Sequence, residues 1–151
     1  MKSKKFINFL FLLSVIFIVC LTLYPNSSFG TGEIDKGEKN LIPFHTILRI
    51  LKSDSLYKAI VNIIGNVFLF VPTGFILPIK FKKLNSLFKT ALIGLFISIL
   101  IEYIQLFIPH RWTDIDDVIL NTTGTIIGYK LFCFYVKSLT GFESITWTQK
   151  S

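Results

Sequence analysis

Charged residues are scarce in this sequence: they make up 17% of the chain, and only nine of its 151 residues are acidic. By contrast, 52% of the residues are hydrophobic, and phenylalanine alone occurs 16 times. A soluble helical protein needs polar, water-facing sides on its helices, and the long apolar runs of this chain have none. The composition therefore excludes an ordinary soluble domain and indicates a membrane protein.

Cysteine and histidine are also rare, with two of each. Cys20 and Cys133 fall at different depths of two apolar runs, so a disulfide between them is not expected. No Ser-His-Asp or Cys-His arrangement is evident, which disfavours acyl transfer through a covalent enzyme intermediate. We interpret His110 as a loop residue at headgroup level, and we assign His45 no function.

Four apolar runs approach the length of about 20 residues that crosses a bilayer. They cover residues 6–24, 60–79, 88–108 and 115–136. The first follows lysines, as in a secretory signal, but it exceeds a signal's apolar core and no A-x-A-like site follows, so we expect it to be retained. The sequence predicts an all-α integral membrane protein with four transmembrane helices, forming a single domain over residues 1–151.

The net charge of +7 is a topology signal rather than the footprint of a nucleic-acid partner. Lysines precede the first run, separate the second from the third, and follow the fourth. They are Lys2, Lys4, Lys5, Lys80, Lys82, Lys83, Lys89, Lys137 and Lys150. Short lysine-rich segments stay in the cytoplasm, so we expect a multi-pass protein of the cell membrane with both termini cytoplasmic.

Residues 25–59 form the expected exterior loop, which opens with turn-forming residues. Within the loop, Phe44, Ile47, Leu48 and Leu51 recur at helical spacing. This pattern predicts a short amphipathic helix that lies in the outer membrane interface rather than crossing the membrane.

Four of the nine acidic residues lie between positions 102 and 117, where the last two apolar runs meet. With the expected topology, polar side chains of three helices reach one depth, in the outer leaflet. These are Asn62 and Asn66 in the second run, Glu102 and Gln105 in the third, and Asp114, Asp117 and Asn121 in the fourth. A polar pocket on the outer side is the expected result.

Helical phase supports this expectation. At about 100° per residue, Asp114, Asp117, Asn121, Gly124 and Gly128 share one stripe of the fourth helix. The two glycines have the small-xxx-small spacing that allows another helix to approach closely. Asp116 falls on the opposite side, and we interpret it as a solvated residue of the interface.

The alternative is that these groups only hold the helices together. An interhelical polar contact contributes about 0.6–2 kcal/mol, whereas a carboxylate at the helix centre costs roughly 2.5–3.5 kcal/mol. This balance favours a functional site. The candidate catalytic residues are Glu102, Asp114 and Asp117, and the candidate substrate-binding residues are Asn62, Asn66, Gln105, Arg111 and Asn121.

Two kinds of chemistry fit such a set. The carboxylates of Glu102, Asp114 and Asp117 could bind a divalent cation that bridges to a phosphate. Alternatively, one carboxyl group with a raised pKa acts as general acid while another stays ionised. Arg111 would contact a phosphate or pair with Asp114.

Several segments together resemble the VanZ-like family of small bacterial membrane proteins. They are Asn40-Leu41-Ile42-Pro43-Phe44, the run from Asn62 to Gly74, Glu102-x-x-Gln105, and Arg111-x-x-Asp114-x-x-Asp117-x-x-x-Asn121-x-x-Gly124-x-x-x-Gly128. The likeness covers residues 40 to 128. It implies an integral membrane protein, and the family's founding member is linked to low-level resistance to the glycopeptide teicoplanin.

Three functions remain open on these grounds. The first is an outer-leaflet site that binds or modifies a lipid-linked cell-wall intermediate. The second is a non-catalytic component that reorganises the envelope or shields a target from a glycopeptide. The third is a small oligomeric transporter with Glu102 as a proton-coupled carboxylate, which is disfavoured because the polar residues stop short of the inner half. Membrane lipids are expected partners in each case.

Overall fold

The computed structural model describes residues 4–23, 39–52, 57, 60–108 and 113–140. Their elements, in chain order, are α1 (Lys4–Leu23), β1 (Lys39–Asn40), α2 (His45–Leu51), the π-helix η2 (Ile60–Ile64), α4 (Gly65–Lys80), the 3-10 helix η3 (Lys82–Leu84), α5 (Leu87–Gln105), β2 (Thr113–Asp114) and α6 (Ile115–Thr140). The described part of the chain is thus almost entirely helical, as the sequence predicts.

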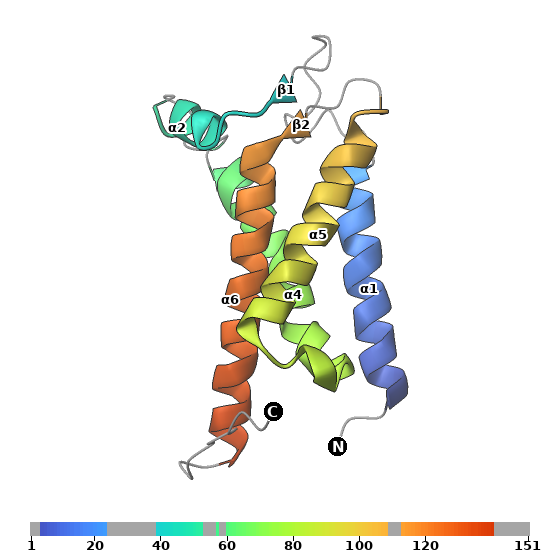
Figure 1. Ribbon diagram of the computed structural model, residues 1–151. Helices are drawn as coiled ribbons and strands as arrows, with labels where there is room; N and C mark the ends of the chain where they lie inside the picture. Colours follow the sequence, from blue (N-terminus) through green and yellow to red (C-terminus); the bar gives the residue numbers. More distant parts are fainter. Residues whose placement is uncertain (1–3, 24–38, 53–56, 58–59, 109–112, 141–151) are drawn as a thin grey trace.

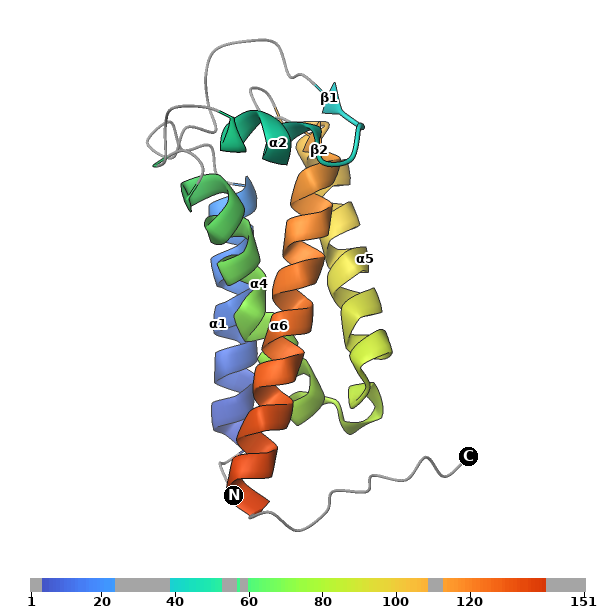
Figure 2. The same cartoon turned by 90° about the vertical axis from the view of Figure 1, so that its left-hand side faces the viewer.

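Four long helices lie side by side in an elongated bundle (Figure 1). α1 and α5 run towards one end of the bundle, and α4 and α6 run back (Figures 1 and 2). The short elements α2, β1 and β2 gather where α5 ends and α6 begins, and we call this the polar end. The opposite end, with the start of α1, the η3 turn and the end of α6, is called the basic end.

Three helical segments are long and apolar enough to cross a membrane, namely Lys4–Leu23, Ile60–Lys80 and Leu87–Gln105. They match the first three predicted runs to within a few residues. α6 is longer, but its polar residues keep it out of this group, so the fourth crossing stays a prediction. The chain is accordingly a helical membrane protein with three candidate spans in its described part.

α4 remains helical through Pro72 and Pro78, although a proline offers no N–H to the carbonyl one turn earlier. Packing by neighbouring helices is what allows this in membrane proteins, and Thr73, Gly74 and Pro78 are all buried.

Glycines hold α6 against α4. A Cβ atom built on Gly124 would lie 2.1 Å from the carbonyl oxygen of Val67, and one on Gly128 would lie 2.1 Å from that of Val71. A methyl group at either position would collide with the backbone of α4. The prediction that this glycine pair packs against another helix is therefore confirmed.

α2 occupies the position of the predicted amphipathic helix, but it has only seven residues. Leu48 and Leu51 are exposed on it, as are Leu41, Ile42 and Phe44 just before it. These apolar side chains do not pack into the bundle, and their insertion into a membrane interface stays a prediction.

Candidate functional site

The four carboxylates between positions 102 and 117 gather at the polar end. Glu102 lies near the end of α5, Asp114 belongs to β2, and Asp116 and Asp117 lie in the first turn of α6. Glu102, Asp114 and Asp116 are buried, and Asp117 is half-buried. Three of them belong to or immediately precede the start of α6, where the positive end of the helix dipole favours negative charge.

Asp114 joins two loops to the bundle. β1 and β2 pair in parallel, with Asn40 opposite Asp114. The amide of Asn40 donates to Asp114 Oδ1 at 2.8 Å and to the Thr46 hydroxyl at 3.1 Å. Asp114 Oδ1 also accepts the backbone N–H of Asp116 at 2.9 Å, which is the bond of a helix N-cap. Asp114 therefore positions α6 and the segment before α2.

Asp116 corrects the sequence interpretation. It was expected to be a solvated interface residue, yet it is only 1% exposed. Its Oδ1 accepts the backbone N–H of Phe44, and its Oδ2 accepts those of Thr46 at 2.8 Å and Ile47 at 3.0 Å. The helical phase was right, but the side of α6 that faces away from the stripe is covered by α2 rather than by solvent.

The contacts of Asp116 explain a strained backbone. Phe44, the N-cap residue of α2, has φ of 65° and no capping side chain of its own. Such a left-handed conformation costs an ordinary residue roughly 1–2 kcal/mol. Three charge-assisted hydrogen bonds to Asp116 offset this cost and supply the missing cap from a different helix.

Asp117 reaches α4. Asn66 Nδ2 donates to Asp117 Oδ1 at 2.5 Å, and this bond joins the first turns of α4 and α6. Sequence analysis placed both residues at one depth and assigned both to the site, and the structure brings them into contact. Since Asp117 is half-buried, the pair is accessible from outside the bundle.

The two polar residues of α5 face different neighbours. Glu102 Oε2 accepts the backbone N–H of Asp114 at 2.8 Å, so it belongs to the carboxylate group. Gln105 instead donates from Nε2 to the carbonyl of Thr22 in α1 at 2.9 Å. Gln105 thus ties α5 to α1, whereas the Asn66–Asp117 pair joins α4 and α6.

Besides Gln105 Oε1, two buried amide oxygens have no hydrogen-bond partner among the described residues. Asn121, 2% exposed, donates from Nδ2 to the hydroxyl of Ser98, while its Oδ1 is unsatisfied. Asn62 Oδ1 is buried and unsatisfied as well. Asn121 is one turn below Asp117 on the same face of α6, and Asn62 is one turn above Asn66. Both oxygens are acceptors that lack a donor.

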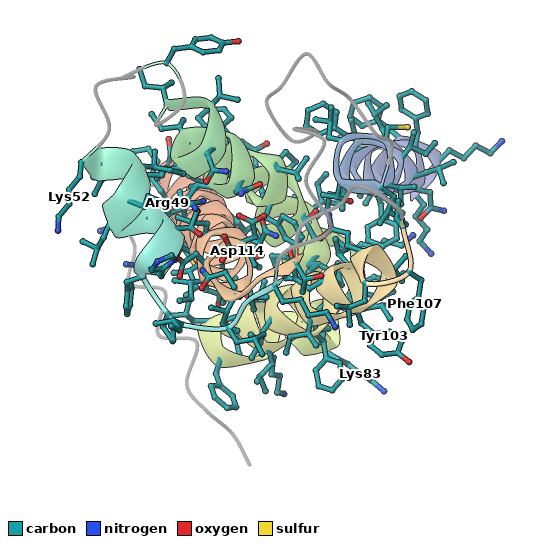
Figure 3. The ribbon with its side chains drawn as sticks, turned by 90° about the horizontal axis from the view of Figure 1, so that it is seen from above. Arg49, Lys52, Lys83, Tyr103, Phe107 and Asp114 are labelled. Carbon is teal, nitrogen blue, oxygen red and sulfur yellow. The ribbon has the colours of Figure 1, made fainter. Side chains whose placement is uncertain are left out.

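Among the described cations at the polar end, Lys39 belongs to β1, Arg49 belongs to α2, and Lys52 follows α2 directly. Figure 3, a view from above, shows Arg49 towards the inner side of α2, near the start of α6 where Asp114 lies, while Lys52 points outward. Arg111 and His110 lie outside the described residues. The phosphate-binding role assigned to Arg111 stays a prediction.

The described residues contain no group of three or more His, Cys, Asp or Glu side chains placed to hold a metal ion. The carboxylates instead accept hydrogen bonds from backbone amides and from asparagine side chains. The arrangement of this part of the chain therefore favours hydrogen-bonding chemistry over a divalent cation held by Glu102, Asp114 and Asp117.

Asn40, Ser98 and Asp116 are contacts that the sequence reasoning did not assign to the site. A cue for Asp116 was available: α2 begins after an apolar Phe rather than after Ser, Thr, Asp or Asn, so its N–H groups need an outside acceptor. Nothing in the sequence pointed to Ser98, a small residue in an apolar run.

Fold and site together define a helical membrane protein with a buried carboxylate and asparagine network at one end. The chain belongs to the VanZ/LLP1 family, whose model matches residues 10–136. This confirms the resemblance to the VanZ-like family.

Among curated proteins, Protein VanZ of Enterococcus faecium is 41% identical over 71 residues. The aligned stretch covers 47% of this chain and 44% of that protein, so the chain spans less than half the length of this relative. No solved structure matches the chain.

Proposed function

We propose that the polar end faces the cell exterior and binds a lipid-linked component of the cell envelope. Through this binding, the protein lowers susceptibility to glycopeptides of the teicoplanin type. Family membership and the similarity to Protein VanZ support the resistance role. In this proposal α6 is a fourth membrane crossing and both termini are cytoplasmic.

The orientation is supported by the separation of charge along the bundle. The basic end carries lysines at the start of α1, in the turn between α4 and α5, and near the end of α6. The four carboxylates between positions 102 and 117 are all at the opposite end. Lysine-rich segments are retained in the cytoplasm, which directs the carboxylates outward.

The chemistry of the polar end favours a ligand that donates hydrogen bonds. Asp117 of α6 is a half-buried acceptor. Two unsatisfied oxygens lie near it in the chain: that of Asn121, also in α6, and that of Asn62 in η2, which leads into α4. An unsatisfied buried acceptor costs about 1–3 kcal/mol, and a hydroxyl or amide N–H of a ligand would remove that cost. The sugar hydroxyls and peptide amides of a lipid-linked wall intermediate are such donors.

Binding fits the geometry better than chemical modification. Asp114 and Asp116 bond to backbone N–H groups that position α6 and α2, so their carboxylates serve the fold. Asp117 is the carboxylate best placed to meet a ligand. The single observation that carries the proposal is the half-buried Asn66–Asp117 pair between α4 and α6.

Susceptibility testing checks the proposal. A strain lacking its own copy is complemented with wild type, Asp117→Asn, Glu102→Gln or the control Thr123→Val, an exposed position on the same helix. We expect teicoplanin resistance to fall to the level of the empty strain in Asp117→Asn. The control keeps resistance, and immunoblots of the membrane fraction verify equal insertion.

Two results would contradict this account. If the wild-type gene does not change teicoplanin susceptibility, the protein has no resistance role. If the membrane-inserted Asp117→Asn variant restores full resistance, Asp117 is not part of a binding site.

The exposed apolar surface of α2 supports a second candidate, a component that reorganises the outer membrane surface without binding a specific ligand. In the same strains, Leu48→Gln with Leu51→Gln would then abolish resistance, while Asp117→Asn would not. The opposite pattern selects the binding site.

A further inference from the structure

An apolar groove of about 450 Å³ runs along the bundle between α1, α4 and α5, and none of the four carboxylates lines it. Its lining extends from Phe11 and Phe81 at the basic end to Leu23 and Ile104 near the polar end. Thr73 is its single polar side chain among the described residues. Because all three helices are candidate membrane spans, the medium around this groove is hydrocarbon.

The basic end of the groove carries a lysine in direct contact with its lining. Lys80 Nζ lies 4.9 Å from the ring centre of Phe11 and 5.4 Å from that of Phe81. The same ammonium donates to the side-chain oxygen of Asn8 in α1. These contacts fix a positive charge at the point where the groove ends.

Two further lysines lie beside this point. Leu84, another lining residue, belongs to the η3 turn. Lys83 is the residue directly before Leu84 in this turn. Lys89 Nζ donates to the carbonyl of Lys83 at 3.4 Å. Lys83 and Lys89 are exposed, so their ammonium groups are open to a ligand from the membrane surface.

We propose that this groove is a binding site for an anionic phospholipid. One acyl chain lies along α1 and α5, and the phosphate lies among Lys80, Lys83 and Lys89. Basic pockets between transmembrane helices bind anionic head groups in this manner. The site is separate from the polar end, and its failure would leave the proposed function untouched.

Size and charge both select a lipid over a helix of a second copy. A helix with its side chains is about 10 Å wide. An acyl chain is far thinner and matches the lining along its length. The lysines at the end of the groove add a preference for a negatively charged head group.

Native mass spectrometry of the purified full chain tests the proposal. The protein is released from bilayers of equal parts phosphatidylglycerol and phosphatidylcholine with identical chains, and the ratio of retained lipids is measured. We expect wild type to retain one phosphatidylglycerol in preference to phosphatidylcholine. Each lysine near a phosphate contributes a factor of about five, so Lys83→Gln with Lys89→Gln lowers the ratio about 25-fold.

The matched control Lys130→Gln with Lys137→Gln removes the same charge from α6, which does not line the groove, and should keep the ratio. Ile97→Trp fills the groove and should abolish retention of both lipids. If Ile97→Trp does not fold, Val19→Phe, at a half-exposed position of the lining, takes its place as the groove-filling variant.

Four results would overturn the proposal. They are equal retention of the two lipids by wild type, an equal drop in the α6 control, undiminished retention in the groove-filling variants, and a lipid-free dimer, which would place a second copy on the groove.

Discussion

A carboxylate buried in a membrane protein has a structural or a ligand-binding task, and the neighbouring residues Asp116 and Asp117 divide these tasks. Asp116 is 1% exposed and accepts three backbone N–H groups of the segment 44–47. Asp117 is half-buried and pairs with the Asn66 side chain. Asp116 thus serves the fold, and the next residue, Asp117, is the proposed contact for a ligand.

Asp116→Asn should destabilise the protein and release α2. Asparagine keeps the shape, but its Nδ2 would face N–H donors and its oxygen carries no charge. Hydrogen bonds to charged groups contribute about 1.5–3 kcal/mol. We expect the free energy of unfolding of the detergent-solubilised protein to fall by about this amount. Amide exchange at Phe44, Thr46 and Ile47 should accelerate at the same time.

Asp117→Asn is the matched control, because Asp117 accepts from Asn66 of α4, whereas these three amides donate to Asp116. Unfolding and exchange in Asp116→Asn that match wild type would contradict the capping role.

The role of Asp116 shows why the sequence did not predict which carboxylates are buried against the backbone. Periodicity places Asp116 on the side of α6 opposite Asp117, and this was correct. What covers that side depends on a contact between α6 and a segment about 70 residues earlier. The free-energy cost of burying a carboxylate had favoured a functional site. At Asp114 and Asp116 hydrogen bonds from backbone amides offset this cost.

Among the elements, α6 depends on α4 for its position. Gly124 and Gly128 place α6 directly on the carbonyls of Val67 and Val71, and the two helices run in the same direction. Thr125, fully buried beside them, packs against Gly74 of α4 and Gly94 of α5. Small residues thus bring three helices to one point below the carboxylates.

Gly124→Ala should therefore destabilise the bundle, because its Cβ would lie 2.1 Å from a backbone oxygen that cannot rotate away. Overpacking of this kind costs about 1–3 kcal/mol. Gly65→Ala provides the control, since a Cβ there meets nothing within 4 Å and alanine favours the helix by up to about 1 kcal/mol. Denaturant unfolding in micelles measures both.

Equal effects of the two alanine variants would show that helix propensity, not close packing, determines the outcome.

At the scale of helices, the sequence predicted where each helix begins and ends better than which helices contact one another. Apolar runs gave the bounds of α1, α4 and α5 to within a few residues, since length and hydropathy are local properties. The spacing of Gly124 and Gly128 predicted close approach but not the partner helix. Gln105 was assigned to the site with Glu102, yet it bonds to Thr22 of α1, because the directions of neighbouring helices are not encoded locally.

For the whole molecule, the four carboxylates between positions 102 and 117 lie at the polar end, whereas most of the described lysines lie at the basic end. The two proposed sites follow this separation, with a donor-bearing ligand at the polar end and an anionic lipid at the basic end. The proposed site at the polar end requires this end to face the exterior and α6 to cross the membrane. That orientation is the central claim.

Labelling of single cysteines in intact cells tests this claim most directly. Cys20 and Cys133 are replaced, and one cysteine is introduced at Leu41, beside Asn40, or at Ser138, near the end of α6. We predict that a membrane-impermeant maleimide labels Leu41→Cys in intact cells and Ser138→Cys only after the cells are opened. Labelling of both in intact cells, or of Ser138→Cys alone, would contradict the orientation and with it the outward-facing site.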